Sequence, residues 1–249
     1  MTGGHPLDNP VLASLAGPHA RFAQRRGAVV RYPADVSPFA GLPDQPGAAD
    51  WGDLAALAGP GALVGLAGVR VPPPDEWEVV QELEGVQFVD GGADPAAREA
   101  DPAARTEAHT GDDLAIVRLG SADVPEMLDL ARRTRPGPFL PRTVELGVYL
   151  GIRCAPGRGG ALVAMAGERM NPPGWTEISA VCTDEQWRGR GLAERLVRTL
   201  MTGIRGRGQS PFLHVVADNA AAIRLYERLG FRIRGTTMFS GVRVPGQAQ

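Results

Sequence analysis

The feature that most restricts the fold of this chain is a basic, glycine-rich stretch between an extended run and an amphipathic run. It reads Q-W-R-G-R-G-L-A and occupies residues 186–193. Residues 176–183 before it are strand-like, and residues 191–205 after it repeat apolar positions at helical spacing. A glycine-rich turn that opens a helix suits phosphate, because the backbone can approach closely and the first amides are unpaired. The stretch therefore predicts a strand–turn–helix unit that binds an anionic ligand.

Two common nucleotide sites do not fit this stretch. No Lys follows the glycines, as a nucleotide P-loop requires. The dinucleotide fingerprint needs Gly or Ala where Glu194 stands. The candidate that remains is the pyrophosphate of another cofactor.

A second motif follows one strand later. The run N-A-A-A-I-R-L-Y-E-R-L-G-F spans residues 219–231, after the strand-like residues 212–216. Together the two motifs resemble the acetyl-CoA-binding core of the GNAT superfamily of N-acetyltransferases. That family carries a Q/R-x-x-G-x-G/A loop and a later N-x-x-A-x-x-L-Y-x-x-x-G-F helix. The resemblance covers roughly residues 114–243 and is weak or absent before them.

The resemblance implies acetyl-CoA as co-substrate and no metal. The loop would hold the pyrophosphate, the preceding strand would pair with the pantetheine amides, and the later helix would follow the pantetheine arm. The residues implied for the cofactor are Val181, Cys182, Thr183, Arg188, Gly189, Arg190, Gly191, Leu192, Ala193, Asn219 and Tyr226. We expect Asn219 also to cap its helix. Cys182 is expected to be a buried, inert thiol rather than a nucleophile, because no base adjoins it in the sequence.

Two residues match catalytic positions of the family. Tyr226 resembles the general acid that protonates the departing CoA thiolate, with packing as the alternative role. Glu177 matches the position of a general base, but a carboxylate is far less basic than an alkyl amine. Relay through water or a raised pKa would ease that mismatch. An anchor for the substrate ammonium, or a surface carboxylate, is the alternative role for Glu177.

The acceptor site is less well defined by the sequence. In the family, the first helices and the late strands flank the acetyl group. That nominates Phe139, Arg142, Tyr149 and Arg169 for substrate binding, together with Met170. An Arg there would suit a carboxylate on the acceptor.

The pattern of elements predicts an α/β (α+β) fold with a mixed, mostly antiparallel GNAT-type sheet flanked by helices. We expect a smaller N-terminal α/β domain at residues 1–90, a polar linker at 91–113 and the acetyltransferase domain at 114–249. This two-part layout is similar to the glycine N-acyltransferase-like branch of the superfamily. Within it, residues 76–89 suggest two strands meeting at Glu84-Gly85, and residues 231–234 and 237–242 two further strands.

Composition restricts the partners. The net charge is −2 and all 26 basic residues are Arg, so no global field favours nucleic acid or a membrane surface. No apolar run reaches the length of a membrane span, no signal peptide is evident, and two cysteines suggest no disulfide framework. We expect a cytoplasmic monomer or homodimer.

The sequence thus predicts an N-acetyltransferase that acts on an amine of a small molecule or peptide by direct attack in a ternary complex. Two alternatives stay open. One is transfer of a longer acyl group to an amino acid, and the other is a CoA-binding regulator without turnover.

Overall fold

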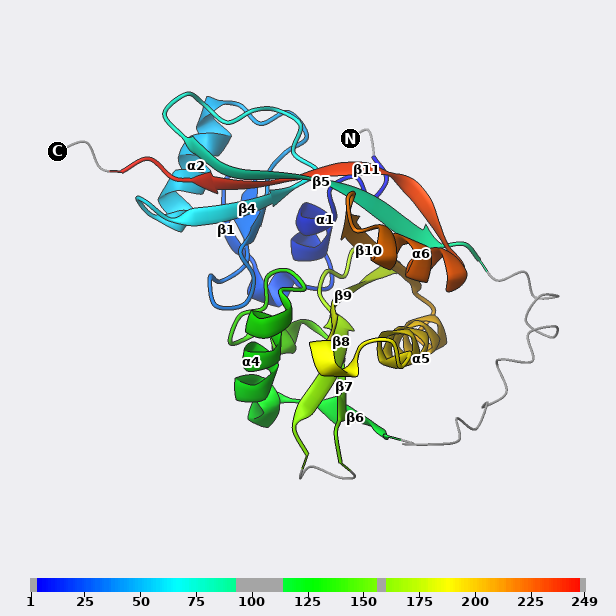
Figure 1. The fold of residues 1–249 in the computed structure, drawn as a ribbon. Coiled ribbons are helices and arrows are strands. Elements are labelled where there is room, and N and C mark those ends of the chain that lie inside the picture. Colours follow the sequence, from blue (N-terminus) through cyan, green and yellow to red (C-terminus); the bar gives the residue numbers. More distant parts are fainter. Residues whose placement is uncertain (1–3, 93–113, 156–159, 247–249) are drawn as a thin grey trace.

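The computed structural model describes residues 4–92, 114–155 and 160–246. Within them, eleven strands form one sheet in the order β1-β2-β3-β4-β11-β5-β10-β9-β8-β7-β6. Of the strand pairs in the described residues, only β3 with β4 and β9 with β10 are parallel. The predicted mixed, mostly antiparallel sheet with flanking helices is confirmed (Figure 1). Residues 93–113 of the predicted linker lie outside the described part.

The C-terminal half follows the predicted order of elements closely. Its 3₁₀ turns are η3 (Ser121–Asp123), η4 (Thr143–Leu146) and η5 (Glu185–Trp187). Its helices are α4 (Val124–Thr134), α5 (Leu192–Gly206) and α6 (Ala220–Arg228). Its strands are β6 (Ile116–Leu119), β7 (Tyr149–Arg153), β8 (Leu162–Glu168), β9 (Trp175–Thr183), β10 (Ser210–Val216) and β11 (Phe231–Arg243).

The N-terminal half repeats part of this plan. It contains α1 (Pro10–Ala16), the turn η1 (Ala20–Phe22) and α2 (Ala48–Ala58). Its strands are β1 (Gln24–Arg26), β2 (Val29–Arg31), β3 (Phe39–Gly41), β4 (Leu63–Ala67) and β5 (Glu78–Asp90). In both halves a helix connects a parallel pair of strands and a long strand follows: β3-α2-β4 then β5, and β9-α5-β10 then β11.

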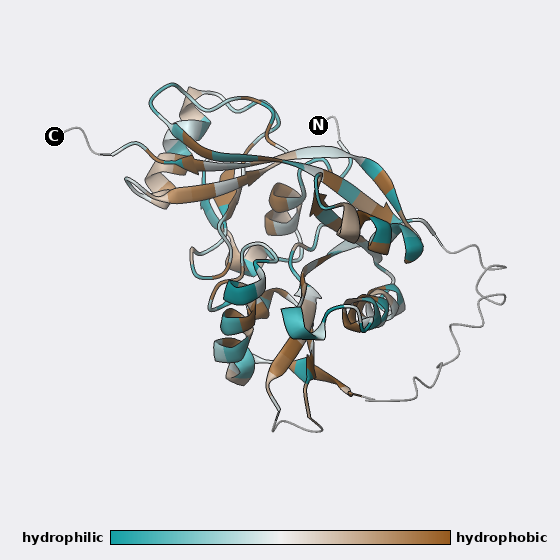
Figure 2. Ribbon diagram, viewed as in Figure 1, coloured by the Kyte–Doolittle hydropathy of each residue, from teal (hydrophilic) through white to brown (hydrophobic). Residues whose placement is uncertain are grey.

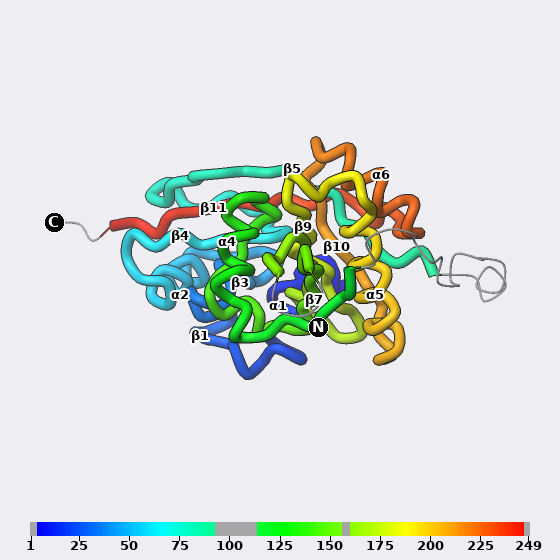
Figure 3. Tube along the Cα trace, turned by 60° about the horizontal axis from the view of Figure 1, so that its bottom comes forward, coloured from blue at the N-terminus to red at the C-terminus, as the bar shows by residue number. Residues whose placement is uncertain are grey.

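The two halves exchange their last strands. β5, from the N-terminal half, pairs with β10, and β11, from the C-terminal half, pairs with β4. β5 and β11 also pair with each other, and Figures 1 and 3 show them running side by side across the molecule. Arg205 of α5 donates to Asp90 of β5 at 2.7 and 2.8 Å. The sheet is therefore continuous across the predicted domain boundary.

Two predicted strand breaks are wrong. Residues 78–90 and 231–243 each form one continuous strand. Gly85 is no turn, because it pairs with Thr237 within the ladder, and a Cβ there would lie 2.8 Å from the Phe239 ring. Gly235 follows a shift of register between Ile233 and Gly235, so β11 has a bulge where a turn was predicted. Both glycines mark local requirements of long strands rather than chain reversals.

Helix α5 packs on one face of β8–β10, and α4 packs on the other face of β8 and β9. Ala164 and Ala166 of β8 belong to the core under α5 and α6, whereas Met165 packs under α4. Figure 2 shows hydrophobic residues concentrated in β7–β9 and hydrophilic ones on the outer turns of α4 and α5. A third core, around α1, combines Leu7 and Val11 with C-terminal residues including Phe212, so the halves share buried surface. No helix of the described residues is long and apolar enough to cross a membrane.

Candidate active site

Strands β9 and β10 lie side by side at one end and separate at the other. Their pairing is confined to Trp175–Glu177 with Ser210–Phe212. Further along β9, Met165 and Gly167 of β8 pair with Cys182 and Ser179, so β9 holds one extra residue there. Ala180 lies in this bulge with a φ of 53°. A bulge turns backbone groups out of the ladder, so β9 offers unpaired amides at the point where the strands separate.

The glycine-rich loop connects the end of β9 to α5. Gly189 and Gly191 have φ values of 77° and 71°, in the left-handed region that favours glycine. Gly191 is the N-cap of α5 and supplies no side chain to its first amides. The start of this 15-residue helix therefore presents unpaired N–H groups and the positive end of the helix dipole.

A cleft with a volume of about 860 Å³ lies between this loop, the end of β9, the end of α4 and helix α6. Ten of the eleven residues predicted for the cofactor line it; Arg190 does not, and its guanidinium lies 4.5 Å from the centre of the Trp187 ring. The residues that the sequence analysis missed are Thr134, Arg135, Pro136, Trp187, Glu194, Ala221, Ala222, Leu225 and Arg228. Most of them are neighbours of the two motifs in the sequence, but Thr134, Arg135 and Pro136, at the end of α4 and just after it, are not.

The cleft contains an unsatisfied polar atom. The Thr183 hydroxyl oxygen is buried and has no hydrogen-bond partner among the described residues. Such an atom loses the hydrogen bonds of water without a replacement, which costs about 1–3 kcal/mol. A ligand with amide groups along β9 would supply the missing partner. The donor set of loop amides, bulge and hydroxyl therefore fits a phosphate-bearing ligand with an amide arm.

Asn219 and Tyr226 both face the cleft from α6. The Asn219 side chain accepts from the Ala222 amide at 3.1 Å, so its predicted cap is confirmed. Tyr226 is 7% exposed and its ring contacts Phe88 and Phe231. Burial raises the pKa of the Tyr226 phenol above its usual value, so this group keeps its proton at any physiological pH.

Cys182 is an unreactive thiol in this setting. It is 7% exposed, and burial raises its pKa to about 11 despite a hydrogen bond with Thr134. Since the thiolate is the nucleophile, a thiol with this pKa is inert near neutral pH.

Glu177 is fully buried in a cluster of polar side chains. Arg169 donates to both of its carboxylate oxygens at 2.7 and 2.8 Å, and Nδ1 of His214 donates to one of them at 2.7 Å. Burial alone would raise the pKa of Glu177, but the charge and hydrogen bonds of Arg169, with His214, outweigh it and lower the pKa to about 2. A general base needs a free oxygen and a pKa near the working pH, and Glu177 has neither.

A second cavity, of about 400 Å³, shares the lining residue Pro136 with the first cleft. Arg169 and His214 line it, together with residues of β3, β4, β5 and β11. The other proposed acceptor residues lie elsewhere. Phe139 and Tyr149 pack against each other in the core under α4, and Arg142 is on the surface, paired with Asp35 and Glu145.

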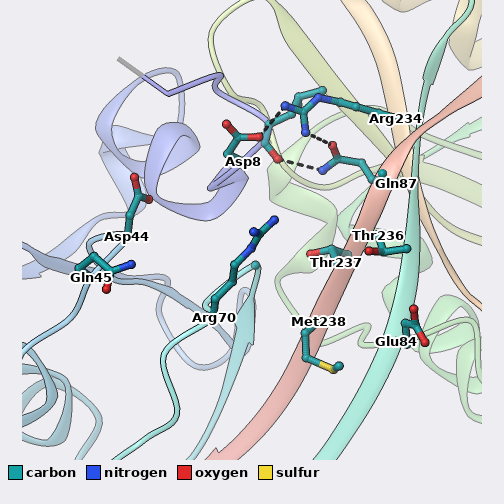
Figure 4. Close-up of a pocket in the computed structure, with 13 residues that line it drawn as sticks. Asp8, Asp44, Gln45, Arg70, Glu84, Gln87, Arg234, Thr236, Thr237 and Met238 are labelled. Atoms are coloured by element: carbon teal, nitrogen blue, oxygen red, sulfur yellow. Dashed lines mark hydrogen bonds and ion pairs between the residues drawn. The ribbon is translucent and has the colours of Figure 1, made fainter. Parts of the chain in front are cut away.

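A third cavity, of about 620 Å³, is formed mainly by the N-terminal half and β11, and Figure 4 shows its polar lining. Arg234 donates to Asp8 at 2.5 Å and to the Gln87 oxygen at 2.9 Å. These bonds orient the Gln87 amide, whose nitrogen donates to the Leu7 carbonyl and lies 3.0 Å from Nε2 of His214. The polar chain thus continues from this cavity through the sheet to Glu177 and Arg169.

The fold and cleft define an acetyltransferase of the kind that carries a phosphate loop beside a split pair of strands. The FR47-like protein family matches residues 149–240. An acetyltransferase of the GNAT family from Novosphingobium aromaticivorans is 38% identical and superimposes with a TM-score of 0.81 over 99% of this chain and 100% of that one. The chain belongs to the GNAT family and is an acetyltransferase.

Curated relatives match shorter stretches of the chain. N-alpha-acetyltransferase RimI of Mycobacterium tuberculosis is 38% identical over 87 residues, which are 34% of this chain and 51% of the relative. L-amino acid N-acetyltransferase AaaT of Escherichia coli is 38% identical over 58 residues, or 22% of this chain and 36% of that protein. The chain thus spans about half or less of the length of these relatives, whose names carry different acceptors.

Proposed function

We propose that this protein transfers an acetyl group from acetyl-CoA to the amine of a small molecule or peptide. The observation that carries the proposal is that the phosphate loop, the bulge of β9 and Tyr226 line one cleft. A second cavity, from which we expect the acceptor to approach, shares the lining residue Pro136 with that cleft. The two reactants would then meet where β9 and β10 separate.

The residues of the cleft divide the work of holding acetyl-CoA. The amides of Gly189–Ala193 and the α5 N-terminus suit the pyrophosphate, with Arg188 beside them. The edge of Val181–Thr183 suits the amides of the pantetheine arm, with Asn219 across the cleft. Acetyl-CoA supplies an activated thioester, so the main task of the protein is to align the two reactants.

Tyr226 holds a proton at the cleft, where a leaving thiolate needs one. Its phenol is a weaker acid than a thiol by about 2 kcal/mol at reference pKa values, and burial widens that gap. Proton transfer is therefore coupled to loss of the leaving group rather than completed before it.

Glu177 takes a different role from the base predicted by the resemblance. With both oxygens on Arg169 and a pKa of about 2, it remains a carboxylate and cannot take a proton from an amine. We assign it as a positioning residue that fixes Arg169. The acceptor then enters as the neutral amine or loses its proton to water.

A pair of glycine variants tests the cofactor site. Gly191→Ala and Gly208→Ala each place a side chain at a left-handed φ, 71° and 75°, with nothing within 4 Å of the new Cβ. Both should lose about 1–2 kcal/mol of folding stability. Only Gly191→Ala should weaken CoA binding, by about tenfold or more, since its loop must shift or its Cβ meets the pyrophosphate.

Calorimetric titration with CoA measures the affinity, and release of free thiol from acetyl-CoA with an amine panel measures turnover. Wild-type protein that binds no CoA, or equal CoA affinity in the two variants, would contradict the assignment of this cleft.

A further inference from the structure

We propose that the acceptor is an amino acid with an apolar side chain, bound in the second cavity with its carboxylate on Arg169. This inference rests on the proposed function, since it names the acceptor of that reaction. It is based on the position of Arg169, on the apolar side chains that line the cavity, and on the absence of Asp and Glu from the described lining residues.

Arg169 presents one free edge of its guanidinium. Glu177 occupies Nε and one hydrogen of NH2, and NH1 makes no hydrogen bond to a described residue. Arg169 is 9% exposed and is one of the residues that line the cavity. A carboxylate can still form the bidentate pair with NH1 and NH2, because a guanidinium offers five donors in a planar fork.

The guanidinium is also held in place before any ligand binds. Glu177 fixes it from one side, and the ring of Phe39 lies 5.1 Å from its central carbon. Glu177 is itself held by His214, and His214 by Gln87. A side chain fixed in this way loses little conformational entropy on binding, which is an advantage that a flexible surface Arg lacks.

The walls of the cavity are largely apolar. The apolar lining residues are Pro38, Phe39, Leu63, Val64, Leu83, Pro136, Pro138, Val215, Val216 and Phe239. Leu63 and Val216 are 56% and 38% exposed, which leaves them available to a ligand. An apolar substituent on the acceptor would bury against this surface and gain about 25 cal/mol for each Å² covered.

The cavity lacks a carboxylate for a second ammonium. No Asp or Glu is among the described residues that line it, and Glu177 behind Arg169 has both oxygens occupied. A polyamine or another polycation would place an unpaired charge against Arg169 and apolar walls, which is costly. The charge pattern therefore favours an acceptor whose only charge besides its amine is negative.

The deciding experiment compares amino acids with their amides in a thiol-release assay with acetyl-CoA. Leucine, methionine and phenylalanine should each show a kcat/KM at least about tenfold above that of the corresponding amide, because only the acid can form the charged hydrogen bonds with Arg169. The amide has the less basic amine and is chemically the easier acceptor, so such a preference would report recognition of the carboxylate. Spermidine should be the poorest acceptor.

Two isosteric variants sharpen the test. Gln81→Glu adds a negative charge to the wall of the acceptor cavity, and Gln45→Glu adds the same charge to the cavity of Figure 4. Both positions are exposed, so neither change should disturb folding. Gln81→Glu should reduce the acid-to-amide ratio by about three- to tenfold, and Gln45→Glu should leave it unchanged.

Calorimetric binding of leucine and leucinamide gives a readout that does not depend on turnover. Tighter binding of leucine supports the inference, and equal or tighter binding of leucinamide overturns it. Thiol release that is fastest with amides or spermidine would also overturn it while leaving the proposed function intact. If CoA fails to bind, the proposed function fails, and the calorimetric comparison still decides whether this cavity recognises a carboxylate.

Discussion

The two halves of this protein share a topology but not a chemistry. Each contains a parallel pair of strands joined by a helix, followed by a long strand that completes the sheet of the other half. In the C-terminal half, α6 lies between β10 and β11 and lines the cleft. In the N-terminal half, residues 68–77 between β4 and β5 contain no helix.

The N-termini of the two connecting helices explain why only one half suits a phosphate. The N-cap of α5 is Gly191, which has no side chain to cap the helix. The first turn of α5 also contains an acidic residue, Glu194, but its carboxylate pairs with Arg198 at 2.9 Å. α2 begins at Gly47, and the carboxylate of Asp50 in its first turn accepts from the Gly47 amide at 2.8 Å. A negative charge already occupies the position where an anion would bind. The comparison shows that the fold supplies a helix N-terminus, while local sequence decides whether it is open to a ligand.

The largest expected effect is a loss of kcat on changing Tyr226 in the C-terminal half, and Tyr32 in the N-terminal half is its control. Tyr226→Phe should lower kcat by about 10²- to 10⁴-fold with CoA binding retained, because the cleft loses the proton it holds. Tyr32→Phe removes a hydroxyl that lies 2.9 Å from Nδ1 of His19. That variant should lose about 1–2 kcal/mol of stability and keep its kcat.

Steady-state kinetics and urea unfolding of both variants measure the contrast. An unchanged kcat in Tyr226→Phe would reduce this residue to a packing role, and a large fall in kcat for Tyr32→Phe would show that the N-terminal half takes part in the chemistry.

The second effect concerns the exchanged strands. Gly85→Val would place its side chain 2.8 Å from the Phe239 ring and 3.3 Å from the Val215 carbonyl. Overpacking of this kind costs about 1–3 kcal/mol. Because β5 pairs with both β10 and β11, both halves should unfold together in one transition at a lower urea concentration.

Gly241→Ala is the matched control on β11, since a Cβ there would meet its nearest neighbour at 3.7 Å. Circular dichroism and tryptophan fluorescence should give the same midpoint for each variant. Two separate transitions in Gly85→Val would mean that the halves are independent units after all.

The sequence predicted the elements of the C-terminal half well because their determinants are local. Asn219 caps α6, and Gly189 and Gly191 take the left-handed φ values that the loop needs. The position of β5 between β10 and β11 depends on contacts between residues more than a hundred positions apart, which no local pattern encodes. Turns were wrongly predicted at Gly85 and Gly235 for the same reason, since both residues lie in strands whose pairing is long-range.

The acceptor side was the least predictable part of the site. Of the five residues nominated there, Arg169 lines the second cavity, Arg142 is on the surface, and the other three, Phe139, Tyr149 and Met170, are core. Arg169 and Glu177 lie on either side of a turn and form an ion pair. We base both proposed roles on that pair, with Glu177 positioning Arg169 and Arg169 binding the acceptor. The position of Glu177 in the sequence suggests a general base, and the sequence does not show that Arg169 and His214 occupy its carboxylate.

A further effect is a pH dependence that distinguishes the halves. Burial, partly offset by the hydrogen bond to the Leu146 carbonyl, lowers the pKa of His19 from 6.5 to about 4. The unfolded chain therefore takes up a proton below about pH 6.5 that the folded protein refuses until about pH 4, so stability falls as the pH drops through this window. The total loss should be about 3 kcal/mol. Glu177, with its lowered pKa, loses its contribution only at lower pH, between about 4.5 and about 2.

Urea unfolding between about pH 7 and pH 4 measures this loss, and His19→Gln should remove most of it, since glutamine does not titrate in this range. His19 belongs to the N-terminal half and Leu146 to the C-terminal half, so protonation acts on a contact between them. If wild type and His19→Gln show the same pH dependence, the acid sensitivity arises elsewhere. If the wild type shows the loss and the variant does not, protonation of His19 in the N-terminal half also limits the stability of the C-terminal half, which carries the phosphate loop.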